Sequence, residues 1–267
     1  MNDFADDHAL LCTAVREAGG IAMRFFRGDL EHWHKAPGDP VSEADHAIDA
    51  FLRERLCAAR PDYGWLSEET EDDPVRLERV RVWVVDPIDG TRAYIEGRAE
   101  FTVAAALVAD GRPVAAAVYN PATEEFFEAR RDAGARLNGE PIAAGEETAF
   151  EGARLLAGRR MFERLGWTPP HDLHFGSVNS IAYRMCLVAS GQYDGCVSLA
   201  AKSDWDIAAA ELVLSEAGGR ATDSHGQDFR YNERSTRHRS VIAAGRPMHA
   251  RLMAILDTAD RPAGVAW

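Results

Sequence analysis

A continuous apolar run ends in two carboxylates in the first third of the chain. The run RVRVWVVD, residues 79–86, is rich in β-branched side chains, and DPIDGT extends from its last residue, Asp86, to Thr91. Such a run predicts a buried strand. Asp, Pro and Gly are also typical of a plain turn, but a turn seldom needs two acids with Gly-Thr directly behind them. The stretch therefore predicts a strand whose end carries functional carboxylates.

The first half of the chain predicts helices packed on an antiparallel sheet. Apolar residues recur at helical spacing in 9–27 and again in 44–58. Residues 32–45, HWHKAPGDPVSEAD, are rich in Gly and Pro, which predicts a loop leading to the second helix. Residues 101–130 predict three strands joined by turns of the Asp-Gly and Asn-Pro types.

Past about residue 150 the pattern changes to alternating helices and short strands. Helices are predicted at 177–190 and 206–217, and apolar strands at 194–199 and 239–244. Asp206 is placed to cap the second helix at its start, and Gly-Gly follows its end. We therefore predict an α/β protein with an α+β half over 1–150 and an α/β half over 151–267.

Charge and composition limit the classes of partner. The formal net charge is −13, which argues against a nucleic acid polymer or an anionic membrane surface, since both require a basic face. The acidic start reads poorly as a signal peptide, and no apolar segment is long enough for a membrane span. The four cysteines are scattered without a C-x-x-C pair, which favours reduced thiols in the cytoplasm and argues against a zinc site.

Four acidic clusters stand out, three of them at the ends of predicted elements. They are Asp45 in DPVSEAD, Glu68 beside Glu69 in LSEET, Asp86 with Asp89, and Asp206 in SDWD. Taken singly, each cluster is explained as a helix cap, a surface acid or part of a turn. If the fold brings them together, the carboxylates repel one another and raise one another's pKa. Mg²⁺ ions would remove that penalty, because Mg²⁺ prefers hard oxygen ligands and often shares them with a substrate phosphate.

Four of these stretches resemble the conserved motifs of a known protein family. DPIDGT at 86–91 and WDIAAAELVLSEAGG at 205–219 are similar to the two signatures of the inositol monophosphatase superfamily, and DPVSEAD and LSEET fall in the family's order and spacing. These are Mg²⁺-dependent, lithium-sensitive phosphomonoesterases with a layered αβαβα fold, and they are commonly homodimers. The resemblance covers nearly the whole chain.

The resemblance implies a role for each motif residue and two or three Mg²⁺ ions. Glu68, Asp86 and the carbonyl of Ile88 would hold one ion, and Asp86, Asp89 and Asp206 a second, with Asp86 as the bridge. Asp45 and Thr91 would orient and deprotonate the attacking water. The amides of Gly90 and Thr91 would face a phosphate oxygen if a short helix begins there. The strand end would then supply metal ligands, and the Gly-Thr pair behind it would meet the phosphate.

The substrate-binding positions depart from the inositol-phosphate pattern. Arg92 follows DGT, where that pattern has Thr, and Leu199 stands where a glutamate binds inositol hydroxyls. Arg184 matches a typical lysine of the 3'(2'),5'-bisphosphate nucleotidases, and two added cations suit a second phosphate. This favours a bisphosphate nucleotidase acting on 3'-phosphoadenosine 5'-phosphate. Alternatives within the family are inositol 1-phosphate and histidinol phosphate.

The sequence leaves open the roles of several other residues near the predicted site, and it leaves open a second class of function. Asn179 and Ser180 would contact a sugar hydroxyl or cap a helix, and Lys35, His32 and His34 lie in the family's mobile loop. The protein could instead bind Mg²⁺ or a phosphorylated metabolite as a sensor without turnover. Every position that the chemistry needs is filled, which weighs against that reading.

Overall fold

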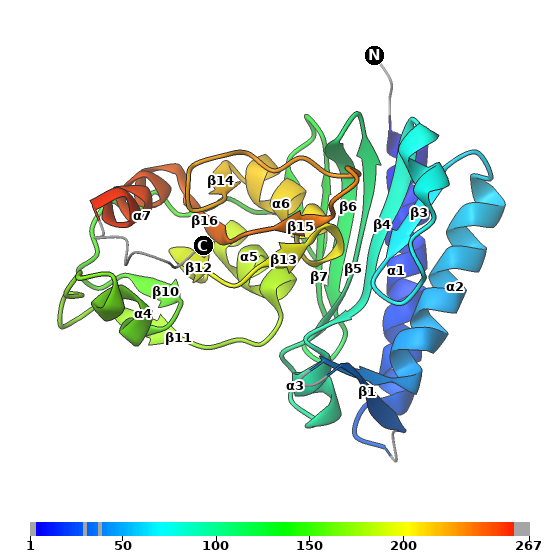
Figure 1. Cartoon of the computed structure of the whole chain (residues 1–267), viewed down its shortest axis with the longest axis horizontal. Helices are drawn as coiled ribbons and strands as arrows, with labels where there is room; N and C mark the ends of the chain where they lie inside the picture. Colours follow the sequence, from blue (N-terminus) through cyan, green and yellow to red (C-terminus); the bar gives the residue numbers. More distant parts are fainter. Residues whose placement is uncertain (1–3, 29–30, 37–38, 259–267) are drawn as a thin grey trace.

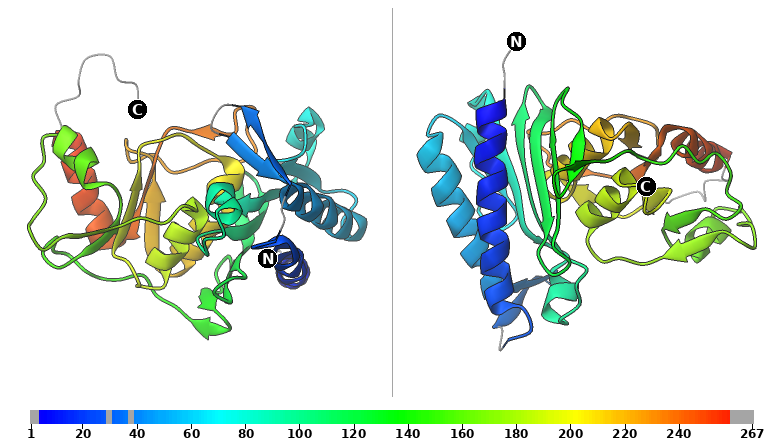
Figure 2. Two further views of the ribbon diagram at one scale, coloured as in Figure 1. Left: turned by 90° about the horizontal axis from the view of Figure 1, so that it is seen from below. Right: turned by 180° about the vertical axis from the view of Figure 1, so that it is seen from behind.

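The computed structural model describes residues 4–28, 31–36 and 39–258, and within them the chain folds into five layers (Figure 1). Two helices cover one face of a large sheet. Two more lie between that sheet and a smaller one, and a further helix covers the far side of the smaller sheet (Figure 2). The predicted α/β class and layered αβαβα arrangement are confirmed.

The larger sheet follows the chain almost in order. Its described strands, in spatial order, are β3 (Gly64–Ser67), β4 (Arg81–Asp89), β5 (Thr102–Ala109), β6 (Arg112–Asn120), β7 (Glu125–Arg130), β8 (Ala135–Leu137) and β9 (Glu140–Pro141). β3 runs parallel to β4, and every later pair is antiparallel. The central strand β5 reads TVAAALVA because both of its faces are buried.

The outer face of the larger sheet is covered by α1 (Ala5–Phe25) and α2 (Glu43–Ala59). Leu11, Val15, Ala18 and Ala22 of α1 recur at three- and four-residue spacing and are fully buried. That spacing places them on one face of the helix, which packs in the same apolar cluster as Trp83 of β4.

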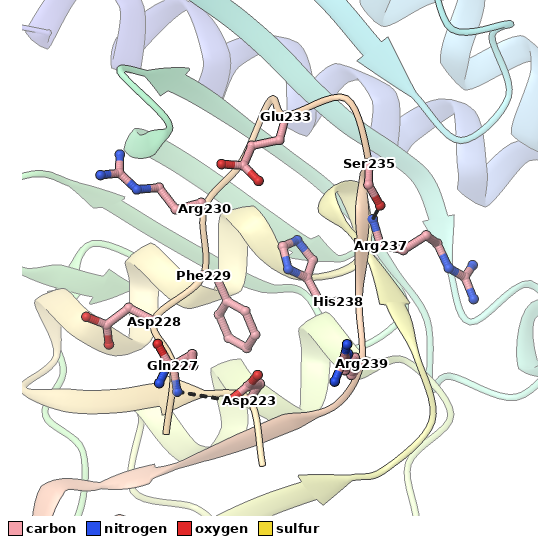
Figure 3. A pocket seen from close by; sticks show the side chains of 10 residues that line it. All are labelled: Asp223, Gln227, Asp228, Phe229, Arg230, Glu233, Ser235, Arg237, His238 and Arg239. Atoms are coloured by element: carbon pink, nitrogen blue, oxygen red, sulfur yellow. Dashed lines mark hydrogen bonds between the residues drawn. The ribbon is translucent and has the colours of Figure 1, made fainter. Parts of the chain in front are cut away.

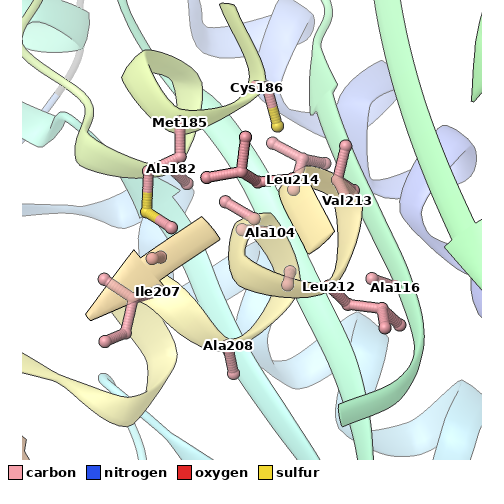
Figure 4. Packing of buried hydrophobic residues seen from close by; sticks show 14 of the residues in the cluster. Ala104, Ala116, Ala182, Met185, Cys186, Ile207, Ala208, Leu212, Val213 and Leu214 are labelled. Atoms are coloured by element: carbon pink, nitrogen blue, oxygen red, sulfur yellow. The ribbon is translucent and has the colours of Figure 1, made fainter. Parts of the chain in front are cut away.

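The inner face of the sheet meets α5 (Ile181–Ala189) and α6 (Asp204–Glu216). Figure 4 shows Ile207, Leu212 and Val213 of α6 packed over Ala104 of β5 and Ala116 of β6. The small alanine side chains let the helix lie close to the sheet. Because α6 has the second sheet on its other side, it is apolar almost all round, as a buried helix should be.

The smaller sheet closes the second half. Its described strands, in spatial order, are β11 (His174–Gly176), β10 (Arg154–Leu156), β12 (Gly195–Ser198), β16 (Val241–Gly245) and β14 (Gly219–Thr222). β10 is parallel to both neighbours, whereas β16 is antiparallel to both of its own. α7 (Arg246–Thr258) and α4 (Arg159–Arg164) lie on its outer side, where Leu252 and Phe162 join one apolar cluster.

Short elements complete the fold. They are η1 (Pro74–Glu78), α3 (Thr91–Ile95), the pair β1 (His32–Ala36) and β2 (Asp39–Ser42), and the pair β13 (Lys202–Ser203) and β15 (Arg237–His238). Among the described residues, no helix combines the length and the apolar character needed to cross a bilayer.

Most predicted elements are confirmed, and two expectations are wrong. The segment predicted as a loop over 32–45 contains the antiparallel strands β1 and β2. The helix predicted to be capped by Asp206 begins at Asp204, with Ser203 as its N-cap. Asp206 is the third helical residue, where its carboxylate accepts a hydrogen bond from the Ser203 N–H in a capping box.

Candidate metal and phosphate site

An irregularity in β4 places Asp86 and Asp89 together. Residues three apart on a regular strand point to opposite faces of a sheet. Here Asp86 lies opposite Ala104 and Asp89 opposite Thr102, so three steps along β4 match two along β5. The extra residue turns Asp89 back to the side of Asp86. The sequence motif therefore works only because the strand carries this bulge.

A third carboxylate comes from the other half of the chain. α6 begins beside the end of β4, and its capping box holds the Asp206 side chain at the start of the helix. One oxygen each from Asp86, Asp89 and Asp206 lies within 4.8 Å of the others. Three of the predicted metal ligands thus meet at one point, although the third lies 117 residues beyond Asp89.

Glu68 lies to one side of this group. It follows β3, which is parallel to β4, and its N–H donates to the Val85 carbonyl at 3.2 Å. The register places it next to Asp86, and its charge acts on Asp86 more strongly than that of any other carboxylate. It does not belong to the group whose atoms fall within 4.8 Å.

The electrostatics of the cluster are unfavourable without cations. Both oxygens of Asp86 are buried and have no hydrogen-bond partner among the described residues. Burial, and then the charges of Glu68, Asp89, Asp206 and Asp45, hold the pKa of Asp86 well above its usual range. Carboxylate oxygens are hard ligands of the kind that Mg²⁺ accepts, and those of Asp86 have no competing donor among the described residues. The residues present therefore fit the metal that the sequence implies.

The pKa values of Asp89 and Asp206 are also raised, and for both of them hydrogen bonds oppose the rise. Burial and the Asp206 charge raise the pKa of Asp89 to about 6, although hydrogen bonds from Ser180 and Ala182 oppose the rise. Burial also raises the pKa of Asp206, while its capping-box hydrogen bond and the charge of Lys202 oppose the rise.

Asp45 and Thr91 meet at the edge of the cluster. Asp45 sits in a capping box at the start of α2, where Ser42 donates to it through its N–H at 2.8 Å and its Oγ at 2.6 Å. Its other oxygen lies 3.4 Å from Thr91 Oγ1, which also donates to the Ile88 carbonyl at 2.9 Å. The pair predicted to handle the attacking water is thus in contact, and the Ile88 carbonyl adjoins it.

A short helix begins directly after the motif. Gly90 is the N-cap of α3 with φ +96°, and the first N–H groups of a helix have no intrahelical acceptor. A Cβ on Gly90 would lie 2.7 Å from the Glu100 carbonyl oxygen. Any side chain at this position is therefore unfavourable, both by conformation and by space.

Gly90→Ala is expected to lower the free energy of unfolding by about 2–3 kcal/mol, because it adds left-handed strain and a backbone clash. Gly134→Ala is the matched control, since Gly134 has φ +77° and a Cβ added there would meet nothing within 4 Å. It should cost only the strain, about 1–2 kcal/mol. Urea unfolding of both variants measures the difference, and equal losses would rule out the clash.

Asp89 also joins the cluster to α5. Its Oδ2 accepts from the Ala182 N–H at 2.6 Å and from Ser180 Oγ at 2.5 Å. Ser180 in turn caps α5 by accepting from the Tyr183 N–H. The capping role predicted as one alternative for Ser180 is confirmed, while a substrate contact by Ser180 or by the half-buried Asn179 stays a prediction.

The two predicted cations lie in different surroundings. Arg92 is exposed in α3, directly after Thr91. Arg184 is half-buried in α5, and its Nε donates to the Val178 carbonyl. Their contact with substrate stays a prediction. The side chain of Lys35, like that of His34, lies outside the described part of the structure.

Sequence reasoning missed a second group of cations beside the site. β13 and β15 pair Lys202 with His238 and Ser203 with Arg237, and the charges of Lys202 and Arg237 both act on Asp206. Successive side chains of β15 point apart (Figure 3). His238 contacts Asp204 at 2.7 Å, while Arg237 is exposed. No local pattern marks these residues, because the pairing of two two-residue strands brings them here.

Known proteins share the sequence pattern and the fold of this chain. Residues 5–261 match the family described as "Inositol monophosphatase family". An inositol-1-monophosphatase of Rhizobium meliloti (strain 1021) is 34% identical over 231 residues, which cover 81% of this chain and 85% of that protein. The Nus factor SuhB of Pasteurella multocida (strain Pm70) is 30% identical over 224 residues, covering 80% and 83%. The crystal structure of extragenic suppressor protein suhB from Bartonella henselae is similar with a TM-score of 0.81 and 27% identity, covering 94% and 98%.

Proposed function

The chain belongs to the inositol monophosphatase family, whose members hydrolyse phosphomonoesters in a metal-dependent way, and we propose that its substrate is a nucleotide bisphosphate such as 3'-phosphoadenosine 5'-phosphate. Asp86, Asp89 and Asp206 would hold the Mg²⁺ ions, with Glu68 and the Ile88 carbonyl beside them. The buried carboxylate of Asp86, with both oxygens lacking a partner among the described residues, carries the assignment of the metal site.

Apart from the metal ions, residues of the chain itself would take part in the hydrolysis. When bound, Mg²⁺ lowers the pKa of a water and neutralises phosphate charge. Thr91 Oγ1 would accept the proton of the attacking water while its own proton passes to Asp45, 3.4 Å away. The N–H groups at the start of α3 would hold a phosphate oxygen. The fixed capping boxes of Asp45 and Asp206 keep these groups in place, and positioning supplies most of the rate in phosphoryl transfer.

The charges around the cluster favour a substrate with more than one phosphate. Lys202 and Arg237 lie on the α6 side of the carboxylates, and Arg92 lies on the α3 side. A single phosphate would be served by the metal ions and the α3 amides. The added cations suit a second phosphate, because charge-assisted hydrogen bonds to phosphate are strong.

An exposed aromatic side chain on the hairpin before α2 favours a nucleoside. Trp33 of β1 stacks on His46, the residue after Asp45, with ring centroids 5.4 Å apart. Its side chain is 44% exposed, so a flat ring can pack on it. Nucleobases bind to such exposed aromatic faces by stacking, whereas an inositol ring has no flat aromatic face.

Inositol 1-phosphate is the second candidate, because the Rhizobium meliloti relative is named for it. The environment of Leu199 weighs against it. Leu199 packs against the apolar cluster of the smaller sheet, so the position offers no hydrogen-bond acceptor to a sugar hydroxyl. A site without that acceptor loses selectivity for the polyol.

Phosphate release from four substrates tests the proposal. They are 3'-phosphoadenosine 5'-phosphate, inositol 1-phosphate, histidinol phosphate and fructose 1,6-bisphosphate, each assayed with and without Mg²⁺. We expect Mg²⁺-dependent release and the highest kcat/KM for the nucleotide. A higher value for inositol 1-phosphate would replace the proposed substrate, and no release from any of them would favour the metabolite sensor.

Trp33→Ala is expected to lower kcat/KM for the nucleotide about tenfold, since stacking of one base is worth about 1–3 kcal/mol. The value for inositol 1-phosphate should stay unchanged. Trp33→Phe keeps an aromatic face and should retain most of the nucleotide activity. Equal losses on both substrates would show that Trp33 acts on the fold of the hairpin and not on the base.

A further inference from the structure

A second group of metal-ligating side chains lies on the opposite side of the larger sheet from α5 and α6. It contains His8 and Cys12 of α1 and Glu128 of β7. His8 and Cys12 are four residues apart, so they share one face of the helix. Glu128 lies two residues after Phe126 on β7, so the two side chains point to the same face of the sheet, where Phe126 packs in the cluster of α1. None of the three belongs to the site described above.

The distances within this group are close to those of a tetrahedral metal centre. His8 Nε2 lies 3.3 Å from Cys12 Sγ, Cys12 Sγ lies 3.2 Å from Glu128 Oε2, and His8 Nε2 lies 3.9 Å from the same oxygen. Zinc bonds of about 2.0–2.1 Å to nitrogen or oxygen and about 2.3 Å to sulfur place tetrahedral ligands about 3.3–3.6 Å apart. Shifts of a few tenths of an ångström would therefore suffice.

We propose that His8, Cys12 and Glu128 bind one Zn²⁺ ion, which ties the N-terminal helix to β7 of the larger sheet. The three donors are of the types that zinc prefers, whereas Mg²⁺ takes oxygen ligands and would leave imidazole and thiolate unused. The scattered cysteines argued against zinc at the level of sequence. The ligand that completes the group lies 116 residues from Cys12 and could not be found by spacing.

The charge and exposure of the group fit an ion with one open position. The Cys12 thiol donates to Glu128, and on binding zinc its proton would leave to solvent. A thiolate and a carboxylate then balance the two positive charges of the ion. Cys12 is 8% exposed, while the side chains of His8 and Glu128 are 21% and 17% exposed. Solvent can therefore reach the fourth position, so water would complete the tetrahedron.

Nearby charges set the conditions for binding. Burial and Glu128 raise the pKa of the Cys12 thiol, and Arg16 opposes this. Burial lowers the pKa of His8; the charge of Glu128 opposes this, and that of Arg130 adds to it. A neutral imidazole is ready to ligate, whereas the thiol must lose its proton. Zinc binding at any thiolate ligand releases a proton, so binding should weaken as the pH falls.

Cobalt absorption tests the proposal, because only a thiolate ligand gives a sulfur-to-cobalt charge-transfer band. Metal-stripped full-length protein is titrated with Co²⁺ in excess Mg²⁺, which occupies oxygen-ligand sites. We expect the band to saturate at one equivalent and to be displaced by Zn²⁺. Cys12→Ala should abolish it, and Glu128→Gln should weaken Co²⁺ binding at least about tenfold.

Two controls separate this site from other thiols and from the catalytic site. Cys57→Ala, which removes a thiol in α2 outside the group, should keep the band. Asp86→Asn should also keep it, because the carboxylate cluster contains no sulfur. Absence of the band in the wild-type protein, or its loss in Cys57→Ala, would overturn the proposal. Persistence of the band in Cys12→Ala would do the same.

Discussion

Asp86→Asn is expected to lower the turnover of phosphomonoesters by at least about 10²–10³-fold, the scale on which the loss of one group that stabilises transition-state charge acts. The charges of four neighbouring carboxylates act on Asp86, and within the cluster Asp86 is the carboxylate whose two oxygens both lack a hydrogen-bond partner among the described residues. A neutral amide attracts a divalent cation less than a carboxylate does, so the variant would hold Mg²⁺ more weakly. Steady-state phosphate release measures the effect.

The same substitution should leave the metal-free protein at least as stable as the wild type. It removes a buried charge that no donor among the described residues satisfies, and the new amide can donate to the neighbouring carboxylates. Mg²⁺ should no longer raise the melting temperature. Near-wild-type turnover, or an unchanged effect of Mg²⁺, would contradict the assignment of Asp86 as a ligand.

Asp194→Asn is a suitable control for Asp86→Asn. Asp194 accepts from the N–H and Nε of Arg154 and lies before β12, whereas Asp206 lies beyond the other end of that strand. Losing the charge there should cost some stability and little turnover. Asp86→Asn, by contrast, should lose most of the turnover and none of the stability of the metal-free protein. That difference between the two variants would then follow from the place of Asp86 in the cluster.

The stability of the metal-free protein is expected to fall as the pH rises from about 4 to 7. The folded-state pKa of Asp89 is raised from 3.8 to about 6, so folding favours its protonated form. Its contribution is complete below the unfolded pKa and is lost as the pH rises through the folded pKa, by on the order of 3 kcal/mol. The raised pKa values of Asp86 and Asp206 act in the same direction.

Mg²⁺ should reverse this trend, since it binds the deprotonated carboxylates and stabilises the folded state more as the pH rises. Urea unfolding at several pH values, in EDTA and in Mg²⁺, measures both curves. Asp89→Asn removes one titrating group, so the fall in EDTA should become shallower. An identical slope in the wild type and in Asp89→Asn would contradict the assigned pKa shift.

The helices and strands of this protein could largely be predicted from the sequence because their signals are local. The alternation and apolar runs of β4 to β7 and the periodicity of α1 and α2 decide which faces are buried. The hairpin of β1 and β2 was missed, since Gly and Pro are typical of loops and of short strands alike. The cap of α6 was placed three residues late, because Ser203 and Asp206 are both good capping residues and act as a pair.

The sequence by itself determined the chemical types and the order of the site residues: carboxylates at 45, 68, 86, 89 and 206 and a Gly-Thr helix start at 90. Only the tertiary structure decided which of them meet. The bulge in β4 turns Asp89 to the side of Asp86, the packing of α6 brings in Asp206, and Glu68 stays at one side. The same holds for Lys202 and Arg237 and for Glu128 beside Cys12. Side-chain chemistry belongs to the residue, whereas proximity depends on strand register and on packing between segments more than 100 residues apart, which no local pattern encodes.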